Sequence, residues 1–196
     1  MNKTKLVNCF LSGRRKSISK YENQTEELQS KVLQKLIHQA IHTEWGQTHG
    51  FAQVNDYNSF TKTSPISTYE ELKGYIDRMR RGEKDVLWSG KVRWYAKSSG
   101  TTNDKSKFIP VSKECLQDTH YRGGTDAVAL YLGQNPRSRM FDGKALILGG
   151  SHSPNYNLPH SLVGDLSAIL IENVSPFVNH FLDSLIILVV FNHLVN

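Results

Sequence analysis

A stretch of small hydroxylated residues, glycine and lysine lies between two short apolar segments near the middle of the chain. It reads Ser98-Ser-Gly-Thr-Thr-Asn-Asp-Lys-Ser-Lys107, and we expect strands at 92–96 and 108–111 on either side. Backbone N–H groups, hydroxyls and an ammonium in such a loop can surround phosphate oxygens, and Gly100 permits close approach because it lacks a Cβ. The P-loop pattern Gly-x-x-x-x-Gly-Lys-Ser/Thr is absent. Without its flanking segments, a loop of this composition is more often an ordinary polar hairpin loop.

The loop resembles the first nucleotide-binding motif of the adenylate-forming (luciferase-like) superfamily, Thr/Ser-Ser-Gly-Thr-Thr-Gly-x-Pro-Lys. The segment from Ser98 to Pro110 resembles more closely the bacterial branch of the auxin-responsive acyl-acid amido synthetase family. Five further segments match that family in the same order, so the resemblance covers residues 10–173: Thr43-Glu-Trp-Gly46, Pro65-Ile-Ser-Thr-Tyr-Glu-Glu-Leu72, Gly82-Glu-Lys-Asp-Val-Leu-Trp88, Gly149-Gly-Ser-His152 and Gly164-Asp-Leu-Ser-Ala168.

The resemblance implies a ligase that works in two steps. ATP and a small carboxylic acid give an acyl-adenylate and pyrophosphate, and the amine of an amino acid then attacks to give an amide and AMP. In this family the loop contacts the ATP phosphates, and Lys107 matches the lysine that closes the superfamily motif. The cofactor-binding residues implied are Ser98, Ser99, Gly100, Thr101, Thr102 and Lys107. Mg²⁺ would accompany ATP, with its ligands outside this stretch of chain, and no catalytic residue is assigned.

A helix after the loop is expected to contact the acid substrate. Ser112 can cap a helix that runs to about Leu132. In the plant members of the family the corresponding helix lines the acid pocket, and the matching positions are Tyr121, Arg122 and Thr125. The Arg122 guanidinium suits a carboxylate; a surface arginine beside a core tyrosine is an equal alternative. Gly123-Gly124 costs about 1 kcal/mol per glycine relative to alanine, which favours close approach by a backbone or a ligand.

The rest of the pattern predicts an α/β fold, as the N-terminal part of the large adenylate-forming domain with helices on an incomplete β-sheet. A helix is expected over 24–42, with Gly46 as a cap near its end and one apolar stripe made of Leu28, Val32, Leu33, Leu36, Ile37, Ala40 and Ile41. A second helix should begin at Thr68, which forms a capping box with Glu71. A buried strand is expected over 145–149. His38 and His42 lie one turn apart, but we expect no metal because no third ligand accompanies them.

The positive charge of the chain is concentrated at its N-terminus. The formal net charge is +6, and residues 1–20 hold six Lys or Arg with no Asp or Glu, while the other residues hold 18 of each sign. This distribution argues against a nucleic-acid-binding face and favours a basic, solvated arm over 1–20 that precedes the domain portion at 21–173.

The two cysteines and the two ends of the chain indicate its compartment and extent. Cys9 and Cys115 match no metal spacing, and the basic N-terminus lacks the apolar stretch of a secretory signal, so we expect the cytoplasm. Residues 174–196 no longer follow the family pattern and include an apolar run that is too short to span a membrane. A frameshift or premature stop is the simplest explanation, and a genuine short protein is the alternative.

Three functions remain open on the sequence. The first is the acid–amino acid ligase, the second an acyl-coenzyme A ligase with the same first step, and the third a non-catalytic truncated pseudoenzyme or binding module. Because family members continue for several hundred residues, we expect the chain to be inactive alone. We also expect it to associate through the apolar window 183–195, for which the family pattern offers no partner.

Overall fold

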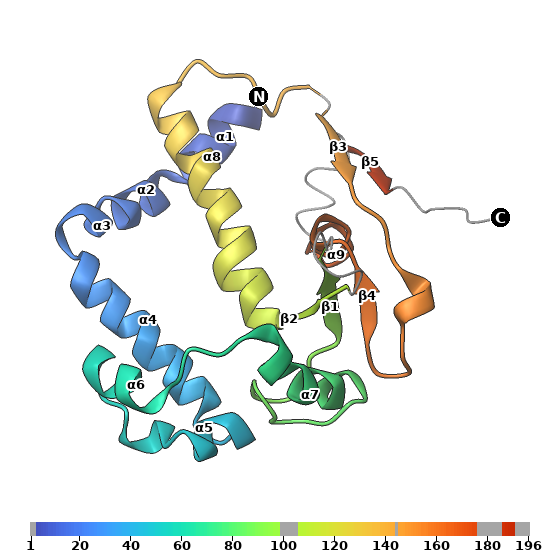
Figure 1. Cartoon of the computed structure of the whole chain (residues 1–196). Helices are drawn as coiled ribbons and strands as arrows, with labels where there is room; N and C mark the ends of the chain where they lie inside the picture. The colour runs from blue at the N-terminus through green and yellow to red at the C-terminus, as the bar shows by residue number, and fades with distance from the viewer. Residues whose placement is uncertain (1–2, 99–105, 144, 176–185, 191–196) are drawn as a thin grey trace. The chain divides into compact units, whose positions relative to one another are not determined.

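The computed structural model describes residues 3–98, 106–143, 145–175 and 186–190. The chain forms two compact units. The hairpin unit comprises residues 24–112 and 153–164, and the α8 unit comprises 1–23, 113–152 and 165–196. Each combines helices with a small sheet (Figure 1), so the predicted α/β class is confirmed. Across the described ranges, no helix has both the length and the apolar character needed to cross a bilayer.

The hairpin unit is built on a three-stranded sheet in the order β2-β1-β4. Strand β1 (Trp94–Lys97) pairs antiparallel with β2 (Phe108–Val111) and parallel with β4 (Leu162–Gly164). The two strands predicted around the loop are therefore confirmed, with β1 beginning two residues later than expected. Helix α7 (Tyr69–Arg80) packs on this sheet, and their shared core consists of Ile76, Met79, Val86, Val92, Tyr95 and Val163.

Helix α7 begins where the capping box predicts. The Thr68 hydroxyl oxygen accepts from the Glu71 N–H, and the Glu71 carboxylate accepts from the Thr68 N–H at 2.6 Å. These reciprocal bonds satisfy two backbone donors that a helix start otherwise leaves without a partner. They fix the position of Tyr69, the first residue of the helix, relative to the sheet.

Helix α4 (Thr25–Ala40) confirms the first predicted helix, but its apolar stripe is only partly buried. Ile37 and Ala40 pack against Phe51 of the short helix η1 (Phe51–Gln53). Val32 and Leu36 are instead 57% and 46% exposed. The seven apolar positions span more of the helix circumference than this small partner covers, so the prediction of one buried stripe was too broad.

Two segments of the family resemblance meet at the start of helix α5 (Glu44–Thr48). The Thr43 hydroxyl donates to the Ala40 carbonyl at 2.7 Å and accepts from the Gly46 N–H at 3.0 Å. The backbone carbonyls of Asp85 and Val86 accept from the N–H groups of Glu44 and Trp45, the first two residues of the helix. The expected cap role of Gly46 is wrong, because Gly46 lies inside α5. A Cβ there would lie 2.0 Å from the Ala40 carbonyl oxygen, so the fold requires glycine.

The hairpin unit is completed by helix α6 (Tyr57–Thr63) and the short helix η3 (Pro154–Tyr156). Asp56 caps α6 by accepting from the Ser59 N–H at 2.7 Å. Helix η3 leads into β4 through a hydrogen bond from the Val163 N–H to the Asn157 side chain.

The N-terminal arm of the α8 unit is helical and packed, which corrects the expectation of a solvated tail. It forms α1 (Lys3–Phe10), α2 (Ser12–Ile18) and α3 (Lys20–Asn23). Thr4 is 2% exposed and donates to Asp142, and Arg14 forms an ion pair with Asp126 of helix α8 (Arg122–Gln134). One of the basic residues that suggested a solvated arm, Arg14, is therefore an ion-pair partner for α8.

Strand β3 (Ala145–Gly149) forms where the third strand was predicted and pairs in parallel with β5 (Ile186–Val190). The expectation that this strand is buried was wrong, because Ile147 and Leu148 are 40% and 62% exposed. Helix α9 (Leu166–Glu172) lies between them in sequence and contacts β3. The pairing corrects the expectation that the apolar window has no partner, because its central residues form β5.

We predict that the buried cap of α5 contributes measurably to stability. Thr43 is 1% exposed, and Thr43→Val keeps its shape but removes both hydroxyl hydrogen bonds. Urea unfolding should show a loss of about 1–2 kcal/mol. The control Thr61→Val removes an exposed hydroxyl contact in α6 and should change the unfolding free energy by less than about 0.5 kcal/mol. Equal effects for the two variants would contradict this role.

Candidate functional site

The two ends of the predicted phosphate loop are joined by the β1–β2 hairpin. The Ser98 N–H donates to the Lys107 carbonyl at 3.0 Å, and the Lys107 N–H donates to the Ser98 hydroxyl at 3.3 Å. Ser98 and Lys107 are therefore neighbours, as a loop closed by them requires. Ser99, Gly100, Thr101 and Thr102 lie outside the described residues, so their phosphate-binding role stays a prediction.

We call the paired residues at the two ends of the loop the stem: Lys97 with Phe108, and Ser98 with Lys107. Helix α7 holds the β2 side of this stem. The Phe108 N–H donates to the Tyr69 hydroxyl at 2.9 Å, and the Lys107 Nζ lies 5.4 Å from the centroid of the Tyr69 ring. That distance is within the range of cation–π attraction. Tyr69 thus contacts both the backbone and the side chain at the point where the loop returns to the sheet.

A second aromatic side chain holds the β1 side. The Lys97 Nζ lies 4.5 Å from the centroid of the Tyr156 ring, and Lys97 is directly opposite Phe108 in the strand register. Tyr156 also packs against Phe108 with 5.6 Å between ring centroids. Neither Lys97 nor Tyr156 was among the predicted site residues. Lys97 immediately precedes the loop, which is a usable signal, whereas Tyr156 is brought to the stem only by the fold.

A buried arginine connects these aromatic residues. Arg80 is 9% exposed, its Cζ lies 3.9 Å from the centroid of the Phe108 ring, and its Nη2 donates to the Tyr156 carbonyl at 2.6 Å. The Arg80 guanidinium therefore fixes Phe108 and Tyr156 relative to each other. Because both residues contact the stem, Arg80 stabilises the stem by holding these two residues in place.

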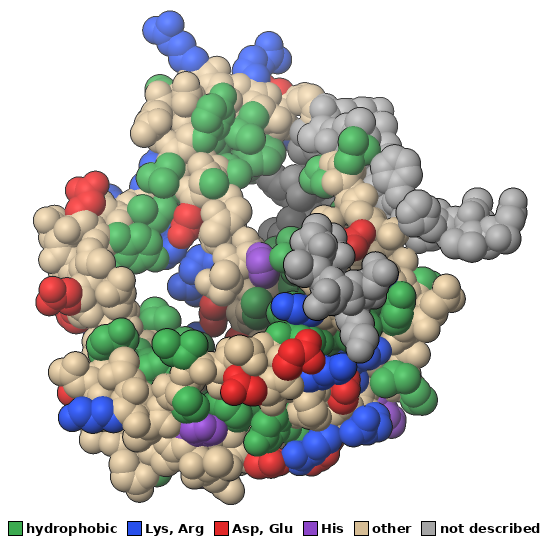
Figure 2. Space-filling view, in the orientation of Figure 1, with side chains coloured by type: hydrophobic (Ala, Val, Ile, Leu, Met, Phe, Trp, Pro, Cys, Tyr) green, Lys and Arg blue, Asp and Glu red, His purple; other side chains and the backbone are tan. Residues whose placement is uncertain are grey.

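The stem carries two ammonium groups that suit an anion. Neither Lys97 nor Lys107 belongs to an ion pair within the described residues, and each contacts a ring that leaves its charge unneutralised. Basic and acidic side chains are otherwise interspersed over the region of α7 (Figure 2). Two separate lysines beside the ends of the loop, rather than a broad basic face, therefore suit a compact polyphosphate.

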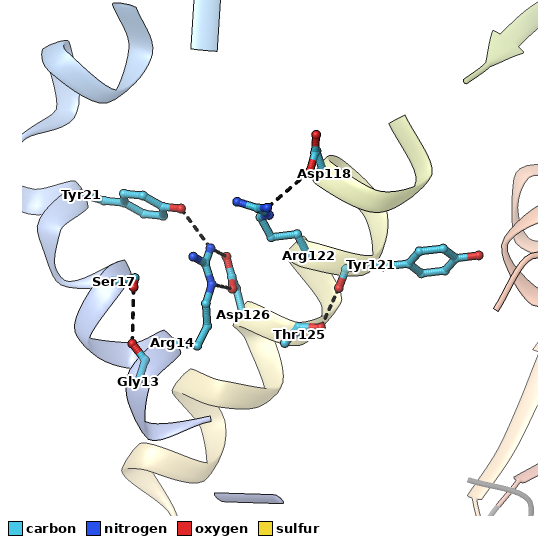
Figure 3. Close-up of polar contacts among 9 residues, drawn as sticks. All are labelled: Gly13, Arg14, Ser17, Tyr21, Asp118, Tyr121, Arg122, Thr125 and Asp126. Atoms are coloured by element: carbon cyan, nitrogen blue, oxygen red, sulfur yellow. Dashed lines mark hydrogen bonds and ion pairs between the residues drawn. The ribbon is translucent and has the colours of Figure 1, made fainter. Parts of the chain in front are cut away.

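The expected acid-binding residues lie at the junction of the π-helix η2 (Cys115–Tyr121) with α8. The Tyr121 hydroxyl donates to the Leu170 carbonyl at 2.8 Å, and burial raises the Tyr121 pKa. Arg122 contacts Asp118 at 3.3 Å and points to a different side of the helix from Tyr121 (Figure 3). The Thr125 hydroxyl donates to the Tyr121 carbonyl at 2.8 Å. The structure does not bring the three side chains together around one point.

The paired glycines of α8 do not have the expected backbone neighbour. A Cβ added at Gly123 or Gly124 would meet no described atom within 4 Å. Close approach by another part of the described chain is therefore not why the helix has glycines here. A π-helix directly before them is a rare feature that often occurs at functional sites.

The last two segments of the family resemblance also meet in space. The Gly150 N–H donates to the Ser167 hydroxyl at 2.7 Å, and the Ser151 N–H donates to the Asp165 carboxylate at 2.8 Å. A Cβ at Gly150 would lie 2.3 Å from that carboxylate. These residues therefore connect the end of β3 to the start of α9, a structural role that spacing alone did not reveal.

No metal site is evident among the residues that the structure describes, where no three His, Cys, Asp or Glu side chains are grouped to hold an ion.

Comparison with known proteins identifies the family. Residues 14–190 match the GH3 family N-terminal domain, and the chain belongs to the GH3 family. The match reaches residue 190, beyond residue 173 where the motif resemblance ends. The fold agrees with the solved structure of the GH3.15 acyl acid amido synthetase, with a TM-score of 0.65 and 24% identity over 80% of this chain.

Curated relatives of the chain are plant amido synthetases. A jasmonoyl–L-amino acid synthetase (JAR6) of Nicotiana attenuata is 32% identical over 108 residues, which are 53% of this chain and 19% of that protein. An indole-3-acetic acid-amido synthetase (GH3.15) of Arabidopsis thaliana is 32% identical over 93 residues, which are 47% of this chain and 16% of that protein. The matched regions thus span less than a fifth of these relatives.

We predict that the Arg14–Asp126 pair makes the α8 unit acid-sensitive. Hydrogen bonds from Arg14 hold the Asp126 pKa below its ordinary value, against the opposing effect of burial. A carboxyl group with a lowered pKa stabilises the fold above its unfolded-state pKa of about 3.9, and this contribution is lost as the pH falls through the folded-state value. Asp126→Asn should therefore lower the unfolding free energy at pH 7, with a difference from the wild type that shrinks below pH about 4.

The matched control is Asp118→Asn, since Asp118 forms a longer and more exposed ion pair with Arg122. This control should lose less stability at pH 7. If the Asp126→Asn difference were the same at pH 7 and pH 3, the ion pair would not be its cause.

Proposed function

We propose that the chain is the N-terminal part of an ATP-dependent acyl acid amido synthetase, from the bacterial branch of its family and the adenylate-forming superfamily. The enzyme would join the carboxylate of a small acid to ATP with release of pyrophosphate. It would then transfer the acyl group to the amine of an amino acid with release of AMP. We expect the reaction in the cytoplasm.

One observation carries the proposal: the loop that resembles the nucleotide motif is closed by Ser98 and Lys107. Beside this closure lie two lysines, Lys97 and Lys107, that form no ion pair among the described residues. ATP supplies the leaving pyrophosphate and thereby the activation of the acid. Lys107 would donate hydrogen bonds to the polyphosphate, and the Ser98 hydroxyl, which already accepts from the Lys107 N–H, would hold the loop end in place. Mg²⁺ would accompany the nucleotide with ligands that remain unassigned.

The names of the relatives support the acceptor class. One similar protein is named a jasmonoyl–L-amino acid synthetase and another an indole-3-acetic acid-amido synthetase, and one solved GH3.15 structure is a complex with 2,4-DB. These names favour an amino acid over coenzyme A as the acyl acceptor. A non-catalytic binding module is the second candidate.

Removal of the Lys107 ammonium should weaken ATP binding. A hydrogen bond to a charged group contributes about 1.5–3 kcal/mol, so Lys107→Ala should raise the Kd for Mg–ATP at least about tenfold. Isothermal titration of the 196-residue chain measures this directly. The control is Lys73→Ala, which removes an exposed lysine of α7 and should leave the Kd within about twofold. Equal affinity of Lys107→Ala and the wild type would remove Lys107 from the site.

Arg122 is proposed to pair with the carboxylate of the acid substrate. ATP–pyrophosphate exchange, driven by a pool of carboxylic acids, tests this role in a full-length family member with the same residue. Arg122→Ala should raise the KM for the acid about tenfold or more and leave the KM for ATP unchanged, because a charge-assisted contact to the acid alone is lost. Unchanged KM values for every accepted acid would assign Arg122 to the protein surface.

A further inference from the structure

We propose that Lys97 is a second cation of the phosphate-binding loop and that Tyr156 is the residue that positions it. This inference rests on the proposed function, since it names a further contact to the same polyphosphate. The family motif begins after Lys97. The contact between the Lys97 ammonium and the Tyr156 ring forms only in the folded chain, so the sequence did not reveal it.

The position of Lys97 follows from the strand register. Lys97 is the last residue of β1 and lies opposite Phe108, the first residue of β2. The loop therefore leaves the sheet directly after Lys97 and returns directly before Phe108. A lysine at this place lies next to both ends of the loop, as Lys107 does.

Among the described residues, Lys97 contacts an aromatic ring and forms no ion pair. The Nζ atom lies 4.5 Å from the centroid of the Tyr156 ring. An aromatic ring attracts a cation through its quadrupole and has no net charge, so the ammonium keeps its full charge and its N–H donors on the side away from the ring. A carboxylate partner would instead compete with an anionic ligand. Tyr156 is thus suited to orient Lys97 for a polyphosphate.

Tyr156 is itself rigidly held. Its ring packs on Phe108, with 5.6 Å between the ring centroids. Its carbonyl accepts a hydrogen bond from the buried Arg80. The guanidinium of Arg80 also lies over the Phe108 ring, with its Cζ 3.9 Å from the ring centroid. The series Arg80, Phe108, Tyr156, Lys97 therefore links the buried face of α7 to the end of the loop. Such a linked set places the Lys97 ammonium before a ligand binds, which lowers the entropic cost of binding.

The test compares two substitutions of one side chain in the 196-residue chain. Tyr156→Phe keeps the ring and Tyr156→Leu removes it, while the control Tyr57→Leu removes a tyrosine that is 69% exposed on α6. Titration with Mg–ATP should show a Kd raised about two- to fivefold by Tyr156→Leu, as expected for loss of a cation–π contact near the surface. Tyr156→Phe and Tyr57→Leu should bind as the wild type does, and Lys97→Gln should bind at least as weakly as Tyr156→Leu.

A second measurement separates the position of Lys97 from its role. The ε-methylene protons of Lys97 should be shifted upfield by the Tyr156 ring in the NMR spectrum of the wild type and of Tyr156→Phe, and not in Tyr156→Leu. An absent shift, or equal ATP affinity in Tyr156→Leu and the wild type, would overturn the proposal. If the shift is present but the wild-type chain binds no ATP, the proposed function fails and Lys97 keeps its position without this role. If ATP binds but Lys97→Gln has no effect, only the present inference fails.

Discussion

The antiparallel pairing of β1 with β2 determines where the two ends of the loop lie. Ser98 and Lys107 are the first and last residues of the loop, yet two hydrogen bonds hold them side by side. The Tyr69 hydroxyl accepts from the Phe108 N–H and so anchors this pairing to α7, whose first turn is fixed by the Thr68–Glu71 capping box. The strand register and the Tyr69 hydrogen bond depend on each other. A slip of one residue in the pairing of β1 with β2 would move Lys107 away from Ser98 and Phe108 away from Tyr69.

Most segments of the family resemblance prove to be structural joints. Glu44 and Trp45 donate to the backbone carbonyls of residues 85 and 86 at the start of α5, which Thr43 caps through the Gly46 N–H. Gly150 and Ser151 donate to Ser167 and Asp165 at the start of α9. In both joints a glycine permits contact with a group that a Cβ would displace, and a short hydroxyl or carboxylate side chain satisfies backbone donors. The joint at α5 lies in the hairpin unit, as the loop does, and the joint at α9 lies in the α8 unit. Among these segments, the loop is the one that bears residues suited to phosphate.

Local signals predicted the elements that local interactions determine. The capping box gave the start of α7, and the apolar runs gave β2 and β3 within their observed bounds. Interactions between distant residues could not be predicted in this way. The packing of Thr4 and Arg14 on partners more than 100 residues away turned an expected solvated arm into three helices. The aromatic support of Lys97 by Tyr156 likewise depends on the return of the chain through η3, for which no local pattern gives a signal.

The account rests on the stem of the loop as the place where a nucleotide binds. The most direct measurement is a titration of the isotope-labelled chain with Mg–ATP, followed by backbone amide chemical shifts. The account predicts that the largest shifts occur at residues 97, 98, 107 and 108 and at Tyr69, while exposed positions of α4 such as Val32 do not respond. Saturable shifts that avoid the stem, or no shifts at millimolar ATP, would contradict it.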